Sequence, residues 1–202
     1  GVYAFQLPSL APAGNHREHH AEPCCVAVAS GLCITGDRRG TICLWPVPSV
    51  GGSRGGLERL CPQRGDSATC LAALPSCARV AAGFSSGAVH IVDCASRTTT
   101  CAIAQGPQVQ SLALAGSAGS FLAVACQDQS VQLWRLAEDG QQANMCERIS
   151  EVLRQPEAAE SRLFIAVHAI SEAAVLYSGQ KGELFAWDTE RRKAQRLAPL
   201  HT

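Results

Sequence analysis

The residues that come closest to a catalytic pattern are residues 83–87 (GFSSG), which match the G-x-S-x-G sequence around the nucleophilic serine of many hydrolases. Such a serine needs a strand before it and a helix after it, so that its hydroxyl is exposed beside an oxyanion hole. Here residues 88–94 (AVHIVDC) are typical of a strand instead. We therefore predict that Ser85 lies in a hairpin turn, and that His90 and Asp93 lie on a strand without forming a triad.

Three histidines near the N-terminus, His16, His19 and His20, could in principle bind a metal ion. Histidines at positions i and i+4 of a helix can share one ion. Because Pro12 and Pro23 flank the three histidines, a helix is disfavoured here. We predict a solvated loop and no metal site.

Other short motifs also favour structural interpretations. Residues 64–66 spell the adhesion tripeptide Arg-Gly-Asp, but three residues recur by chance, and we predict a loop turn. Residues 191–193 (RRK) are basic but are diluted by neighbouring acidic residues, which is typical of a solvated hairpin tip. The glycine-rich residues 51–56 lack the Lys-Ser/Thr pair of a phosphate loop. The sequence therefore predicts no catalytic residue, no metal and no cofactor.

The eleven cysteines are numerous, but their spacing contains no C-x-x-C pair. Most lie in apolar runs such as residues 24–30 (CCVAVAS) and 121–126 (FLAVAC), where a thiol behaves as a small buried hydrophobe. We predict structural cysteines rather than a disulfide framework or a zinc site. This pattern, together with the absence of an N-x-S/T acceptor, favours an intracellular, cytoplasmic setting.

Composition excludes several classes of function. The 202 residues are 47% hydrophobic and 17% charged, which is unlike a disordered tail. Lys plus Arg equals Asp plus Glu at 17 each, so bulk charge gives no support for binding nucleic acid. No apolar stretch reaches the length of a membrane span. Because the chain begins at Gly1 and its only methionine is Met145, we expect a fragment or a processed piece of a longer protein.

One segment recurs four times along the chain. It reads GTICLW, GAVHIV, QSVQLW and GELFAW, and it ends on large anchors spaced 47, 42 and 53 residues apart. The anchors are Trp45, Val92, Trp134 and Trp187. Two short apolar runs precede most of them, and a further run can follow, as at residues 98–104 and 194–200. The pattern predicts units of four antiparallel strands.

The strands of these units carry apolar residues on both faces. An isolated antiparallel sheet would keep one polar, solvated face. Apolar residues on both faces indicate sheets that are each packed between two neighbours, as in blades stacked around an axis.

These units resemble WD40 repeats of a β-propeller. Trp187 and Asp188 match the Trp-Asp pair that ends the third strand of the repeat, whereas Trp45 and Trp134 keep only the tryptophan. The aspartate of the turn between the second and third strands survives only as Asp128, and no clear Gly-His pair is found. The family's buried network of His, Asp, Ser/Thr and Trp is therefore expected to be largely absent.

The resemblance implies an all-β, partial WD40-like propeller of about four four-stranded antiparallel blades plus one stray N-terminal strand. The expected division is 1–10 for the closing strand of a preceding blade, 11–66 for the first blade and 67–106 for the second, then 107–160 for the third with a long insert and 161–202 for the fourth. Remaining blades, or a second copy, would complete the ring.

Two segments break the period. Residues 46–66 are rich in Gly and Pro and are predicted to be an irregular exposed loop. In residues 136–162, Met145, Ile149 and Val152 have the spacing of a helical stripe, and a distorted strand over residues 144–152 is the alternative. The fold favours the strand slightly, and both interpretations stay open at this stage.

We predict a non-catalytic protein–protein interaction scaffold or adaptor within a larger propeller. The alternative is a regulatory or sensor propeller of a multidomain enzyme, or of a nucleotide-driven oligomeriser, whose catalytic domain lies outside this chain. The expected partners are other proteins, with no nucleic acid and no membrane. The resemblance implies binding through rim loops, at His20, Arg38, Arg39, Arg64, Gln108, Arg162 and Lys181.

Overall fold

The computed structural model describes most of the chain as β-strands and connecting turns. The described residues are 2–6, 11–16, 19–47, 57–73, 78–115, 119–128, 130–136, 146–148, 167–171, 174–178, 183–188, 191 and 193–199. No α-helix occurs among them. The prediction of an all-β chain is confirmed.

The strands alternate with short turns along the whole described chain. In chain order they are β1 (Val2–Gln6), β2 (Ala11–His16), β3 (Pro23–Ala29), β4 (Leu32–Asp37), β5 (Ile42–Pro46), β6 (Glu58–Leu60), β7 (Ala68–Ala73), β8 (Arg79–Phe84), β9 (Val89–Asp93), β10 (Thr98–Ile103), β11 (Val109–Ala115), β12 (Phe121–Cys126), β13 (Val131–Leu136), β14 (Cys146–Arg148), β15 (Val167–Ser171), β16 (Ala174–Ser178), β17 (Glu183–Asp188) and β18 (Lys193–Pro199).

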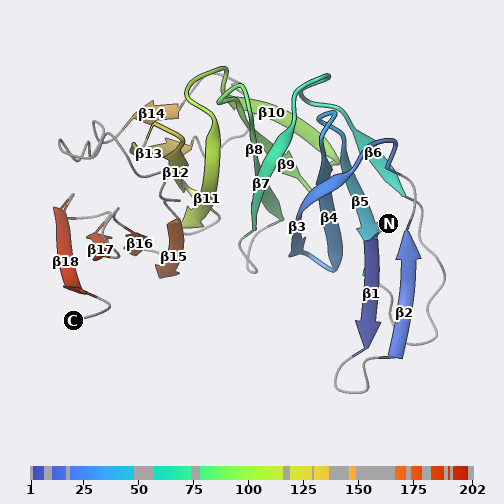
Figure 1. The fold of residues 1–202 in the computed structure, drawn as a ribbon, viewed down its shortest axis with the longest axis horizontal. Helices are drawn as coiled ribbons and strands as arrows, with labels where there is room; N and C mark the ends of the chain where they lie inside the picture. The colour runs from blue at the N-terminus through green and yellow to red at the C-terminus, as the bar shows by residue number, and fades with distance from the viewer. Residues whose placement is uncertain are drawn as a thin grey trace.

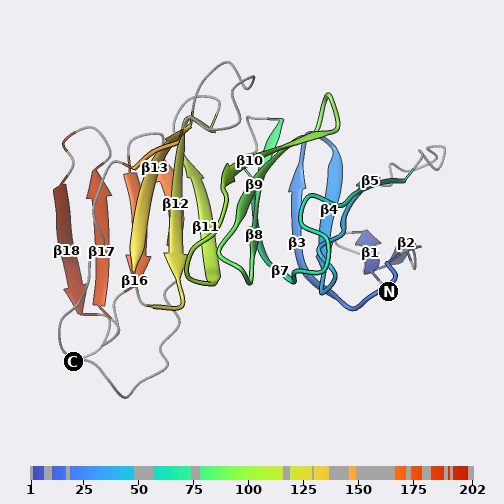
Figure 2. The ribbon, with the colours of Figure 1, turned by 90° about the horizontal axis from the view of Figure 1, so that it is seen from above.

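The strands form four four-stranded sheets, β3–β6, β7–β10, β11–β14 and β15–β18, and one two-stranded sheet, β1–β2. Within each sheet every strand pairs antiparallel with its neighbour in sequence. Figure 1 shows the sheets following one another along an arc, with the first strand of each sheet on its inner side. Figure 2 shows the same sheets standing side by side.

The four anchors occupy the same place in their sheets. Each lies on the third strand and pairs with the second residue of the second strand. The pairs are Trp45 with Cys33, Val92 with Val80, Trp134 with Leu122 and Trp187 with Val175. The recurring segment therefore corresponds to one recurring position of the fold.

The hydrophobic core lies between the sheets. Ile34 and Leu44 of the first four-stranded sheet share a buried cluster with Val80 and Phe84 of the second. A second cluster joins the second and third sheets, and a third cluster brings Phe185 of the last sheet against the third. Because the middle sheets bury side chains on both faces, apolar residues occupy both faces of their strands.

The arc does not close on itself, because β18 and β1 lie at its opposite ends (Figure 1). The chain is a partial propeller with four four-stranded blades. The N-terminal part differs from the prediction, because β2 pairs with β1, so two paired strands stand where a single stray strand was predicted. In an antiparallel pair the two strands hydrogen-bond to each other, which a lone strand cannot do.

The fourth strands account for both segments that break the period. The prediction of an irregular loop over residues 46–66 is wrong for β6, which pairs with β5 in spite of the glycine-rich sequence before it. The strand alternative for residues 136–162 is confirmed at β14, which pairs with β13. Residues 137–145 and 149–162 lie outside the described residues.

Candidate functional site

A cavity of about 300 Å³ lies where three consecutive blades begin. We call it the strand-start cavity, because the first residues of β3, β7 and β11 line it, together with the turn between β4 and β5. Its lining residues are Cys24, Arg38, Ser67, Ala68, Thr69, Gln108, Val109 and Gln110. In a propeller this is the inner side of one end of the blades, where loops from several blades converge.

A β-bulge at the start of each of these three strands shapes the cavity. The register shifts between Pro23 and Cys25, between Ala68 and Cys70, and between Val109 and Ser111. The residue left without a register partner is Cys24, Thr69 or Gln110, and all three line the cavity. A bulge turns a side chain away from the regular alternation, and here three bulges turn side chains toward one space.

A repeated backbone hydrogen bond fixes the residue just before each bulged strand. The N–H of Arg38 donates to the carbonyl of Glu22 at 3.1 Å. The N–H of Ser85 donates to the carbonyl of Ser67 at 2.9 Å. In the third blade the N–H of Gln127 donates to the carbonyl of Gln108 at 2.8 Å. These bonds hold each turn against the start of its own first strand.

Arg38 carries the charge among the described lining residues. Its Nε lies 2.9 Å from a carboxylate oxygen of Glu22, and both side chains are well exposed, at 64% and 68%. The remaining polar lining groups are the hydroxyls of Ser67 and Thr69 and the side-chain amides of two glutamines. Burial raises the pKa of the Cys24 thiol, so this group is uncharged at neutral pH.

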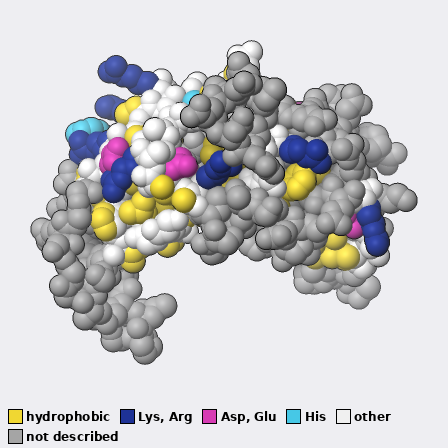
Figure 3. Space-filling model, turned by 180° about the vertical axis from the view of Figure 1, so that it is seen from behind, with side chains coloured by type: hydrophobic (Ala, Val, Ile, Leu, Met, Phe, Trp, Pro, Cys, Tyr) yellow, Lys and Arg dark blue, Asp and Glu magenta, His cyan; other side chains and the backbone are white. Residues whose placement is uncertain are grey.

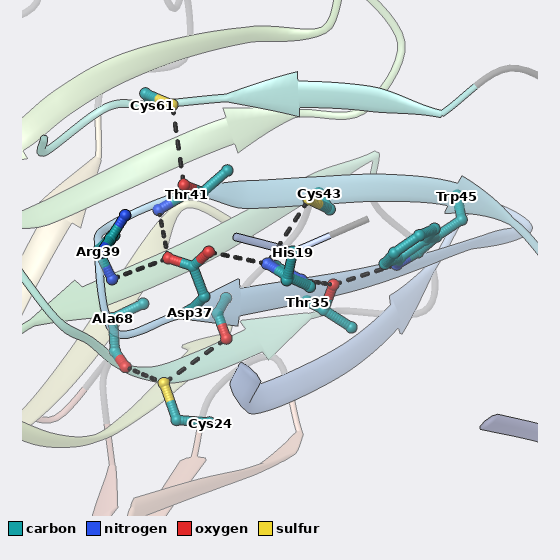
Figure 4. Close-up of polar contacts among 11 residues, drawn as sticks. His19, Cys24, Thr35, Asp37, Arg39, Thr41, Cys43, Trp45, Cys61 and Ala68 are labelled. Carbon is teal, nitrogen blue, oxygen red and sulfur yellow. Dashed lines mark hydrogen bonds and ion pairs between the residues drawn. The ribbon is translucent and has the colours of Figure 1, made fainter. Parts of the chain in front are cut away.

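The turn that presents Arg38 is held by the carboxylate of Asp37. Its Oδ1 accepts hydrogen bonds from the backbone N–H groups of Arg39, at 2.8 Å, and Thr41, at 3.0 Å. Its Oδ2 lies 3.0 Å from Nδ1 of His19 (Figure 4). Asp37 is fully buried, so these bonds replace the solvation that its charge loses.

The same contacts continue into the blade as a buried chain of hydrogen bonds. Nε2 of His19 lies 2.6 Å from the hydroxyl oxygen of Thr35, and that oxygen accepts from Nε1 of Trp45 at 3.1 Å. A neutral His19 that carries its hydrogen on Nδ1 donates to Asp37 and accepts from Thr35, which satisfies every group. The network connects the anchor Trp45 to the turn that bears Arg38.

The prediction that this network is largely absent, and that His19 lies in a solvated loop, is therefore wrong for the first blade. The side chain of His19 is only 4% exposed. The acidic partner, Asp37, lies eight residues before Trp45 rather than at the turn position where the family consensus was sought. His20 is exposed, as a loop residue would be, and the side chain of His16 lies outside the described residues.

The second blade holds its turn in a different way. The hydroxyl of Ser85 and the backbone N–H of Ser86 both donate to the carboxylate of Asp66. Burial alone would raise the pKa of Asp66, but these hydrogen bonds outweigh it and lower the pKa. Asp66 of the Arg-Gly-Asp sequence thus serves as a turn residue, and Ser85 lies in a hairpin turn followed by the strand β9, as predicted.

The structure brings two of the predicted rim residues together, because Arg38 and Gln108 both line the strand-start cavity. Arg39 and Arg64 are exposed on neighbouring turns. A hydrogen bond of 3.0 Å from the N–H of Gly65 to the carbonyl of Arg39 joins these turns. Arg162 and Lys181 lie outside the described residues. Figure 3 shows lysine and arginine side chains at separate points along the face that it displays.

Sequence reasoning missed Cys24, Ser67, Thr69 and Gln110. One signal was available, since Cys24, Thr69 and Gln110 each lie near the start of an apolar run, at the same place in their repeats. The bulges that turn these side chains toward one another have no mark in the sequence. The cysteine prediction is only partly right, because Cys24 and Cys61 are exposed while Cys43 is buried.

Two features are absent from the described part of the chain. It contains no group of three His, Cys, Asp or Glu side chains placed to hold a metal ion. It also contains no helix with the length and apolar character needed to cross a membrane.

Comparison with solved structures identifies the fold. A structure described as U3-55K superimposes with a TM-score of 0.71 at 15% sequence identity, covering 97% of this chain and 59% of that one. A crystal structure of RRP9 WD40 repeats superimposes with a TM-score of 0.72 at 15% identity, covering 97% and 58%. The chain thus spans less than three fifths of the length of these two proteins.

No protein-family model matches the sequence, and no curated protein is significantly similar to it. The structural likeness covers nearly the whole chain, and it agrees with the four-stranded blades and the equivalent anchors described above. On this evidence the chain has the fold of a WD40-repeat β-propeller, in a partial form that comprises four blades and two further strands.

Proposed function

We propose that this chain is a non-catalytic protein–protein interaction scaffold or adaptor, that it forms part of a larger WD40-type propeller, and that its partner binds at the strand-start cavity. Solved structures with WD40 repeats support an interaction role in general terms. The remaining blades, or a second copy, complete the ring in this proposal. An intracellular setting belongs to it as well, and the free thiols of Cys24 and Cys25 favour that setting.

The observation that carries the proposal is the convergence of three bulged strand starts on one cavity that polar side chains help to line. A scaffold that only stacked its blades would need no polar side chains turned out of the strand alternation at this end. Cys24, Thr69 and Gln110 come from three different blades, so no local turn requirement places them together. Rigid sheets hold them in place, which reduces the entropy lost when a partner binds.

Site-specific photo-crosslinking in the cells that produce the protein tests this location. A benzophenone amino acid replaces Gln110 in one variant and Ala95 in a matched control. Ala95 is exposed in the turn between β9 and β10, at the opposite end of its blade. We expect distinct cross-linked partner proteins from position 110 that are absent from position 95. The same products from both positions, or none from position 110, would contradict the proposal.

A further inference from the structure

We propose that the strand-start cavity binds an acidic side chain of a partner peptide, either a carboxylate or a phosphorylated residue. In this inference Arg38 binds the negative charge, and the side chains of Thr69 and Gln110 hold the oxygens. The inference rests on the proposed function, because it names the ligand of the same cavity.

The charge of the lining favours an anion over a cation. The guanidinium of Arg38 is always protonated at physiological pH, and the described lining residues include no carboxylate. Burial raises the pKa of the Cys24 thiol, which also lines the cavity, and this thiol donates to the carbonyl of Ala68 at 2.7 Å. A lysine or arginine of a partner would meet the charge of Arg38, while the neighbouring carboxylate of Glu22 is already paired with Arg38.

The neutral polar groups of the lining can all donate hydrogen bonds. The amide of Gln110 is a donor, and so is the hydroxyl of Thr69, which lies 3.7 Å from the sulfur of Cys70. The side chains of Ser67 and Gln108, just before β7 and β11, are donors as well. Carboxylate and phosphate oxygens only accept, so one anionic group can satisfy several of these donors. Hydrogen bonds to a charged acceptor are about twice as strong as those between neutral groups.

Glu22 competes with the proposed ligand for Arg38. Its carboxylate bonds Nε, which leaves the two terminal nitrogens of the guanidinium for an incoming anion. Both side chains of the pair are more than 60% exposed, so the pair is weak and opens readily. Substitutions of Glu22 and of Arg38 should therefore change affinity for an acidic ligand in opposite directions.

The test measures binding of labelled peptide pools to the 202-residue chain by fluorescence polarisation. Each pool is a degenerate nonapeptide with one fixed central residue, which is glutamate, phosphoserine, serine, glutamine or lysine. We expect the glutamate or phosphoserine pools to bind about tenfold more tightly than the other three. The ratio of glutamate to phosphoserine binding distinguishes the two sources of the negative charge.

The variants make the expectation specific to Arg38. Arg38→Gln should weaken binding of the acidic pools about tenfold, and Glu22→Gln should strengthen it about threefold. Arg135→Gln is the matched control, because Arg135 is an exposed arginine of β13 that does not line the cavity. Thermal unfolding of each variant checks that its blades remain folded.

The outcomes separate this inference from the proposed function. Acidic preference that depends on Arg38 supports both. Binding that lacks acidic preference but is lost in Thr69→Val or Gln110→Ala would overturn the inference and leave the proposed function standing. Binding that no cavity variant changes, or no binding by any pool, would overturn both.

Discussion

At the scale of single residues, the hydroxyl of Thr35 is the central link of the buried network in the first blade. Its oxygen lies 2.6 Å from Nε2 of His19 and accepts from Nε1 of Trp45, and Thr35 is only 1% exposed. Thr35→Val keeps the shape of the side chain but removes both hydrogen bonds. We expect a loss of about 2 kcal/mol in the free energy of unfolding, measured with urea.

The matched control for this substitution is Thr98→Val. Thr98 is an exposed strand residue whose hydroxyl oxygen lies 2.8 Å from that of Ser96. Its replacement should change stability by less than about 0.5 kcal/mol. Equal effects of the two substitutions would show that the network contributes nothing beyond an ordinary surface contact.

Asp37 makes the stability of the first blade depend on pH. Burial alone would raise the pKa of Asp37, but hydrogen bonds from His19, Thr41 and Arg39 outweigh it and hold the pKa below the ordinary value of 3.8. The unfolded chain therefore takes up the proton first, as pH falls. The stabilisation is fully present above the ordinary pKa and is lost as pH falls through the lower, folded value.

Urea unfolding between pH 6 and pH 3 measures this effect. We expect Asp37→Asn to lose about 2–4 kcal/mol at pH 6 and to show a shallower fall in stability below pH 4 than the unsubstituted chain. Part of the fall should remain, because hydrogen bonds also lower the pKa values of Asp66 and Asp93. An unchanged slope in the variant would exclude Asp37 as a source of the pH dependence.

At the scale of elements, the turns between second and third strands depend on glycine where they touch the following linker. Gly40 has a φ of +79°, and a Cβ added there would lie 1.9 Å from the carbonyl oxygen of Gln63. Gly40→Ala must therefore displace the linker that leads to β7. We expect a loss of about 2–4 kcal/mol, measured by chemical denaturation.

Gly31 provides the control, because it has a similar φ of +71° but nothing within 4 Å of an added Cβ. Gly31→Ala should cost only the backbone strain of a left-handed residue, about 1 kcal/mol. If both variants lost the same stability, the contact between the turn and the linker would play no part.

At the scale of the whole molecule, the first strand of the first four-stranded blade carries exposed apolar side chains. Val26 and Val28 of β3 are 61% and 60% exposed, whereas Cys25 and Ala27, which alternate with them, pack against the core. In a longer propeller the next blade would cover this face. The open arc thus leaves part of its blade-packing surface uncovered.

The double substitution Val26→Thr and Val28→Thr tests this interpretation. In the 202-residue chain we expect a change of less than about 0.5 kcal/mol per site, because neither side chain is buried. Ile34→Thr, at a fully buried position on β4, is the control and should cost about 2 kcal/mol or more. A large loss from the double variant would mean that this face is already covered.

The sequence predicted the blades because their determinants are local. Alternation of apolar residues, a glycine-containing turn and a large anchor recur within each unit, and the register places all four anchors at equivalent positions. The sequence did not predict the strand β6, in which only three residues pair after a glycine-rich segment. Such a short strand has too few residues to show alternation.

The candidate site depended on contacts that no local pattern contains. Arg38 and Gln108 were predicted from their place in the rim loops, but the bulges that turn Cys24, Thr69 and Gln110 into the same cavity arise from the pairing of each first strand with its neighbour. His19 and Asp37 are 18 residues apart, and their contact forms only when the blade is assembled. The amino-acid sequence by itself therefore determined the repeating β-architecture, since the alternation of side chains along a strand and the turn to the next strand depend on residues close together in the sequence. The tertiary structure alone decided which polar groups meet, because a polar side chain finds its partner through space.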